Sequence, residues 1–119
     1  MSQDFFTYDI SRHIWESRYQ DRDGEVIHDR SVADTWQRIA NALASVEHDD
    51  PPGWTQRFYR ALENFRFLPG GRIQAGSGTD RRVTLFNCFV MGRVDDSMGG
   101  IFDALKEDAL TMSAWAAVC

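Results

Sequence analysis

The stretch Ser31–Pro52, SVADTWQRIANALASVEHDDPP, decides how the first half of the chain is interpreted. Ser31 is a residue type that caps helix N-termini, and Asp34 stands three residues later, as in a capping box. Apolar residues then recur at helical spacing on one stripe, namely Trp36, Ile39, Leu43 and Val46. The proline pair at the end of the stretch is expected to stop the helix. The stretch therefore predicts an amphipathic helix.

The sequence on either side of this stretch also has helical spacing. Downstream, GWTQRFYRALENFRFLPGG (Gly53–Gly71) predicts a second amphipathic helix, whose apolar stripe is Trp54, Phe58, Leu62 and Phe65. Upstream, DISRHIWESRYQ (Asp9–Gln20) predicts another helix, and DRDGEVIHD around Gly24 predicts a turn or a short hairpin. Residues 1–66 are therefore interpreted as a helical N-terminal region.

The pattern changes after Pro69. GGRIQAGSGTDRR is rich in glycine and polar residues and predicts a loop, which leads into a run of β-branched and aromatic residues at Val83–Met91. Both alternating sets of this run are largely apolar, which favours a strand covered on both faces. A helix is predicted next, capped by Asp95, Asp96 and Ser97. A strand, a short turn and a helix make half of a βαβ unit, so the predicted fold class is α+β or α/β.

Composition limits the range of functions. The 119 residues, 43% of them hydrophobic, suit one domain or part of one, and a net charge of −5 argues against binding nucleic acid or an anionic membrane. The N-terminus is acidic where a signal peptide is basic, and no apolar run approaches about 18 residues. We therefore expect a cytoplasmic protein. The chain has two cysteines, which argues against a disulfide framework.

Cys88 and Asn87 lie at the centre of the predicted strand. A lone cysteine is usually a small buried hydrophobe. An amide among apolar residues, however, needs hydrogen-bond partners, and a polar pocket at this end of the strand would explain both residues. The three histidines are interpreted as surface residues, and no Cys/His spacing predicts a metal site.

Three segments, in this order and spacing, resemble one enzyme family. FLPGGRIQAGSGT (Phe67–Thr79), VTLFNCFVMG (Val83–Gly92) and DSMGGIFDALKEDALTM (Asp96–Met112) look like the start of the catalytic domain of adenosylcobalamin-dependent (class II) ribonucleotide reductases. The lead-in ISRHIWESRYQ is similar to the N-terminal region of that family. The resemblance implies that residues 67–112 begin an α/β barrel whose first strand and helix are present here.

The resemblance also implies roles for particular residues. Cys88 matches one thiol of the redox pair that reduces the ribose and then forms a disulfide. Leu68 and Asn87 match positions beside the substrate, in the loop Leu68–Gly71 and on the strand. Asp96 and Ser97 match the start of a dimer-interface region near the effector nucleotide. The implied partners are a ribonucleoside diphosphate or triphosphate, a nucleotide effector and a second copy of the enzyme.

The tail Ser113–Cys119 departs from the family, which has a glycine triplet here. A codon stretch for Ser-Val-Gly-Gly-Gly-Val, read one base later, encodes Ala-Trp-Ala-Ala-Val followed by the start of a cysteine codon, which reproduces the tail from Ala114. We therefore expect residues 113–119 to be out-of-frame sequence after a frameshift. The other catalytic residues of the family lie far downstream, so these residues alone are expected to be inactive.

Two other functions remain open at this stage. The chain could be a stand-alone interaction or regulatory module derived from the reductase, which binds a partner through Asp96–Met112. It could also be a small thiol sensor that pairs Cys88 with Cys119, although no CxxC-like spacing supports this.

Overall fold

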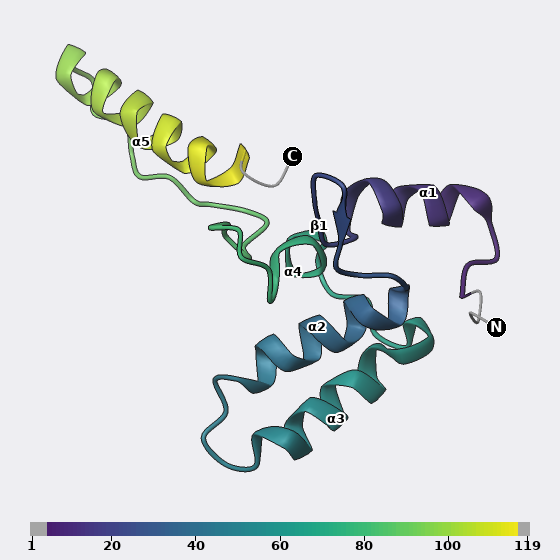
Figure 1. Ribbon diagram of the computed structural model, residues 1–119. Helices are drawn as coiled ribbons and strands as arrows, with labels where there is room; N and C mark the ends of the chain where they lie inside the picture. Colours follow the sequence, from purple (N-terminus) through teal and green to yellow (C-terminus); the bar gives the residue numbers. More distant parts are fainter. Residues whose placement is uncertain (1–4, 117–119) are drawn as a thin grey trace.

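The computed structural model describes residues 5–116, with side chains described for residues 5–113. Its elements follow the chain in the order α1 (Asp9–Arg18), β1 (Arg22–Asp23), β2 (Val26–Ile27), α2 (Val32–Ala44), α3 (Pro51–Leu62), the 3₁₀ turn η1 (Glu63–Phe65), α4 (Gly71–Gly76) and α5 (Met98–Ala116). Helices α2 and α3 lie side by side, α4 lies over the middle of α2, and α5 stands apart from these helices (Figure 1). The described chain is therefore mainly helical.

Helix α2 begins as the sequence predicts. The backbone N–H of Ser31 donates to Oδ2 of Asp34 at 2.8 Å, and the backbone N–H of Asp34 donates to Oγ of Ser31 at 3.4 Å. This is a complete capping box, which satisfies N–H groups that have no partner inside the helix. Trp36 and Ile39 of the predicted stripe are buried, whereas Val46 is exposed because α2 has already ended at Ala44.

The proline pair has a different role from the predicted one. Pro51 and Pro52 do not stop α2 but form the first turn of α3. Proline suits this position because the N–H that it lacks would have no helical partner there. Asp50 caps the helix, with its carboxylate accepting a hydrogen bond from the backbone N–H of Gly53 at 3.1 Å.

The core lies between α1, α2 and the end of α3. It consists of Trp15, Val32, Trp36, Ile39 and Leu62, with partly buried residues such as Phe5, Phe6 and Tyr59 packed against it. The ring of Trp36 meets those of Phe5 and Phe65 edge-on, with centroids 5.0 and 5.2 Å apart. Edge-to-face pairs of this kind add to the stabilisation from area burial.

The short hairpin predicted around Gly24 is confirmed. Strands β1 and β2 pair antiparallel, with Arg22 opposite Ile27 and Asp23 opposite Val26. Gly24 in the turn has φ 57°, a left-handed conformation that glycine adopts without steric cost.

The predicted strand Val83–Met91 is wrong for the described residues, where this segment is a loop with a bend at Asn87. A strand needs a neighbour to pair its N–H and C=O groups, and β1 with β2 is the only ladder in residues 5–116. Most of its apolar side chains are exposed instead of covered, Phe86 at 71% and Val90 at 100%. The predicted strand–helix unit of a barrel is therefore not formed, although its helix, α5, is present.

The predicted glycine-rich loop is also partly helical. Gly71–Gly76 forms the short helix α4, and Ala75 and Gly76 in it are buried. A side chain on Gly76 would have its Cβ 2.6 Å from Cγ2 of Val83, so the glycine allows the following segment to pass close to the helix.

Candidate functional site

A buried ion pair joins the hairpin to α2. Asp29 follows β2, Arg38 is on α2, and their side chains are only 4% and 9% exposed. Nε of Arg38 donates to Oδ1 of Asp29 at 3.3 Å, and Nη2 donates to Oδ2 at 2.8 Å. This two-pronged geometry is the strong form of a carboxylate–guanidinium pair. Removing one partner of such a buried pair leaves an uncompensated charge and costs roughly 3–5 kcal/mol.

A chain of hydrogen bonds links the ion pair to the aromatic core. Nε1 of Trp15 donates to Oγ1 of Thr35 at 3.0 Å, and the Thr35 hydroxyl donates to Oδ2 of Asp29 at 2.7 Å. The side chain of Gln20 donates to the backbone carbonyl of Asp29 at 2.9 Å. Among the described residues, no buried side-chain nitrogen or oxygen lacks a partner. The network therefore fixes α1, the hairpin and α2 relative to one another.

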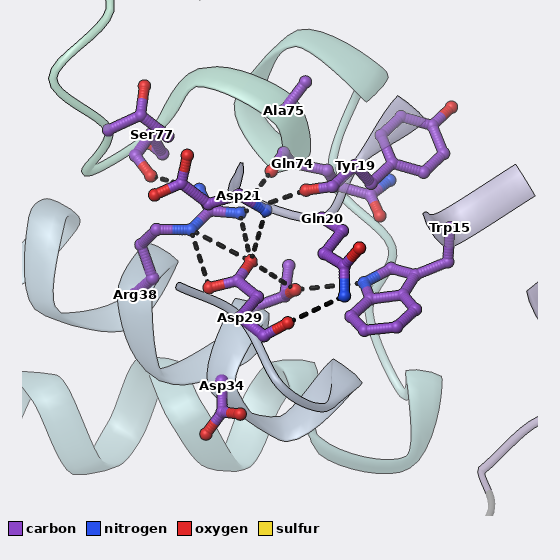
Figure 2. Close-up of polar contacts among 12 residues, drawn as sticks. Trp15, Tyr19, Gln20, Asp21, Asp29, Asp34, Arg38, Gln74, Ala75 and Ser77 are labelled. Carbon is purple, nitrogen blue, oxygen red and sulfur yellow. Dashed lines mark hydrogen bonds and ion pairs between the residues drawn. The ribbon is translucent and has the colours of Figure 1, made fainter. Parts of the chain in front are cut away.

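Arg38 also holds the segment that contains α4. Its Nη2 donates to the backbone carbonyls of Tyr19 at 3.2 Å and Gln74 at 3.0 Å, and its Nη1 donates to that of Ser77 (Figure 2). The carbonyl of Gln74 is in the last turn of α4 and that of Ser77 is at its C-cap, where the helix dipole favours a positive charge.

A second arginine binds the same helix from the solvent side. Nη2 of Arg81 donates to the carbonyl of Ala75 at 3.3 Å and to Oδ1 of Asp21 at 3.1 Å. The Arg81 side chain is 39% exposed, so this pair is solvated and contributes less than the buried one.

An aromatic cavity of about 440 Å³ adjoins the network. Its walls come from the N-terminal segment, α1, α2 and the loop before α4, and they include Phe6, Trp15, Trp36 and Leu68. All of the lining residues are uncharged. The structure therefore places Leu68, a predicted substrate-side residue, at the edge of an apolar cavity, with most of its side chain exposed.

The structure also brings Asn87 to the same loop. A Cβ built on Gly70 would lie 2.5 Å from Nδ2 of Asn87, so the amide packs directly on a backbone that has no side chain. The family resemblance predicts that Leu68–Gly71 and Asn87 lie beside one substrate, and Asn87 does lie against Gly70. That either contacts a substrate stays a prediction.

The other predicted site residues lie elsewhere. Cys88 is exposed, so the alternative of a buried core cysteine is wrong. Ser97 caps α5, its Oγ accepting from the N–H of Gly100 at 3.0 Å, and Asp96 beside it is exposed. Cys119 lies outside the described residues, so a pair with Cys88 is not tested. The histidines are exposed, as the sequence predicts.

Sequence reasoning missed Asp29 and Arg38, the charged centre of the network. One signal was available, because Thr35 is a polar residue beside the apolar stripe of α2 and needs a partner once that face is buried. The sequence offers no comparable signal that Arg38 would reach the carbonyls of α4.

Comparison with protein families identifies the domain. Residues 5–82, more than half of the chain, match the family described as the ribonucleotide reductase all-alpha domain. The chain belongs to this family. The predicted reductase resemblance is thereby confirmed at the level of the family, and the helical fold of the matched region agrees with its description. Searches of curated proteins and of solved structures gave no match.

The family match names the reductase and no cofactor. Within residues 5–113, no group of three or more His, Cys, Asp and Glu side chains could hold a metal ion. None of the helices in the described residues is long and apolar enough to cross a membrane.

Proposed function

We propose that this chain is the helical N-terminal part of a ribonucleotide reductase, which reduces ribonucleotides to 2′-deoxyribonucleotides for DNA synthesis. The observation that carries the proposal is the match of residues 5–82 to the reductase all-alpha domain. The contact of Asn87 with Gly70 supports it. It joins the segment that bears Cys88 to the end of the all-alpha domain. The helical domain would thus hold one edge of a substrate pocket that the barrel completes.

Cys88 has the chemistry for a reductant thiol. Its exposure allows a second thiol to reach it, which disulfide exchange requires. In the proposed reaction two thiols supply two electrons and two hydrogens, the 2′-hydroxyl leaves as water, a C–H bond forms at C2′, and the thiols become a disulfide. The second thiol would come from the catalytic barrel. The 119 residues alone are expected to be inactive, because the resemblance places the second thiol and the other catalytic residues of the family downstream of them.

The cofactor and partners follow from the motif resemblance. We propose adenosylcobalamin as the radical source and a ribonucleoside diphosphate or triphosphate as the substrate. Asp96 and Ser97 would lie near a nucleotide effector and a dimer interface, in a cytoplasmic enzyme. The division into residues 1–66, 67–112 and an out-of-frame tail at 113–119 also belongs to this proposal.

The test is to sequence the gene past codon 119, join residues 1–112 to the reductase frame found there, and assay the enzyme. Deoxyribonucleotide formation that needs adenosylcobalamin and is lost in Cys88→Ser supports the proposal. Activity without adenosylcobalamin would refute the cofactor assignment and leave the reductase function intact. Full activity of Cys88→Ser would refute the role of the thiol, and the absence of a reductase frame would refute the whole proposal.

The exposed face of α5 favours one alternative function. Ile101 and Leu105 lie one turn apart and are 43% and 56% exposed, so an interaction module could use them to bind a partner. Affinity capture with the whole chain, compared with Ile101→Asp and Leu105→Asp, tests this function. A partner that both variants lose and that is unrelated to reductases would favour it over the enzyme fragment.

A further inference from the structure

The position of α4 depends on contacts from outside the helix. Three carbonyl oxygens at or after its last turn, those of Gln74, Ala75 and Ser77, accept hydrogen bonds from arginine side chains. A six-residue helix has too few internal hydrogen bonds to be stable alone. The arginines, together with the packing of Ile73 against the core, therefore determine where this helix lies on the domain.

Arg38 is the better anchored of the two arginines. Asp29 and the carbonyl of Tyr19 hold its guanidinium from the side of the hairpin and α1, while Gln74 and Ser77 receive its remaining donors. One planar group thus joins four segments of the chain (Figure 2). Lysine has a single ammonium group and cannot make the same set of bonds in one plane.

The helix that Arg38 holds begins next to Gly70. The carbonyl of Gly70 accepts hydrogen bonds from the N–H groups of Ile73 and Gln74, at 3.0 and 3.2 Å. Gly70 is therefore bonded to the first turn of α4 and moves with it. Asn87 packs on Gly70 in turn. A shift of α4 therefore moves the surface against which Asn87 rests.

We propose that Arg38 is a positioning residue, which sets the place of Asn87 by fixing α4 and Gly70. Its importance for catalysis rests on the proposed reductase function, in which Asn87 and Cys88 face the substrate. The positioning itself is a property of this chain. Arg38 touches neither Asn87 nor Cys88, and it acts through the backbone of α4.

The experiment is NMR on the whole chain, with two readouts. The first is the nuclear Overhauser contact between the Asn87 side-chain amide and Gly70, and the second is the indole N–H signal of Trp15, which reports the core. Arg38→Lys keeps the positive charge, and the double variant Arg38→Met with Asp29→Asn removes both charges in case a lone charge unfolds the domain. Gly70→Ala, whose new Cβ would displace the Asn87 amide, is the positive control.

We expect both Arg38 variants to lose the Asn87–Gly70 contact and to exchange the Ile73 and Ser77 amides at least tenfold faster, with the Trp15 signal retained. Arg81→Met is the matched control and should keep the contact. The proposal is overturned if the contact persists in both Arg38 variants, or if Arg81→Met loses it equally. It is also overturned if the contact disappears only together with the Trp15 signal, since that would indicate a general structural role. None of these outcomes depends on reductase activity, so the NMR test of positioning can be decided even if the enzyme assay fails.

Discussion

Replacing Thr35 with valine removes one hydroxyl from the centre of the buried network and keeps the shape of the side chain. Thr35 is 2% exposed, so water cannot take the place of the hydroxyl. The indole N–H of Trp15, now 3.0 Å from Oγ1, would lose its acceptor, and Asp29 would lose a 2.7 Å donor. Asp29 keeps its bonds from the Asp21 backbone N–H and from Arg38.

The expected cost follows from these two losses. An orphaned buried donor costs about 1–3 kcal/mol, and a hydrogen bond to a charged group contributes about 1.5–3 kcal/mol. Because Asp29 is still held by other donors, we expect Thr35→Val to lower the free energy of unfolding by about 2–4 kcal/mol, a large part of the roughly 5–15 kcal/mol of a small domain.

The assay is urea unfolding followed by far-UV circular dichroism. The free energies of unfolding are compared between variants whose free energy has the same dependence on urea concentration. Thr35→Ser keeps the hydroxyl and should lose only about 1 kcal/mol for the missing methyl group. Thr55→Val, on half-buried Thr55 of α3, controls for the chemical change itself and should lie within about 0.5 kcal/mol of the parent chain. If Thr35→Val is as stable as Thr35→Ser, the buried network does not carry the energy assigned to it.

Three further predictions concern other elements. Ser31→Ala removes the capping box of α2 and should cost about 1 kcal/mol, measured by thermal unfolding; no change would mean that the cap is not formed in solution. Gly78→Ala should lower the free energy of unfolding by about 1–2 kcal/mol, because the φ of Gly78 is +71° and the new Cβ would lie 3.0 Å from a backbone carbonyl of α2. Gly24→Ala should cost less, because Gly24 has φ +57° but open space around it. If urea unfolding gives the reverse order, the geometry is contradicted. Cys88 should react with a thiol reagent at nearly the same rate in the folded chain as in urea, and protection of tenfold or more would show that its exposure is wrong.

The elements that the sequence predicted well are those set by neighbouring residues. The start of α2 depends on Ser31 and Asp34, and the hairpin depends on Gly24, so short-range chemistry is sufficient for both. Even where a residue's role was misread, as for Pro51, the helix it belongs to was predicted, because its apolar spacing extends over several turns.

The elements that the sequence missed depend on distant partners. Val83–Met91 has the composition of a buried strand, yet composition cannot supply the neighbouring strands that such a segment needs. The pairing of Arg38 with Asp29, and its reach to Ser77 from a position 39 residues earlier, depends on how the hairpin and α4 fold back on α2. The placement of Leu68 and Asn87 near one loop was predicted through the family resemblance and not through spacing.

The separation of α5 from the other helices has a thermodynamic consequence. The radius of gyration is 17.9 Å, whereas a compact chain of this length would have about 13–14 Å, and no side chain of residues 98–113 is buried. Tertiary packing supplies most of the stability of helices in proteins, so a helix with no buried side chain is only weakly stabilised. Heating should therefore melt the chain in two stages: a gradual helix–coil loss of α5 with no sharp heat absorption, then a cooperative transition of the unit that contains Trp36 and Ile39. A single calorimetric enthalpy would describe only the second stage.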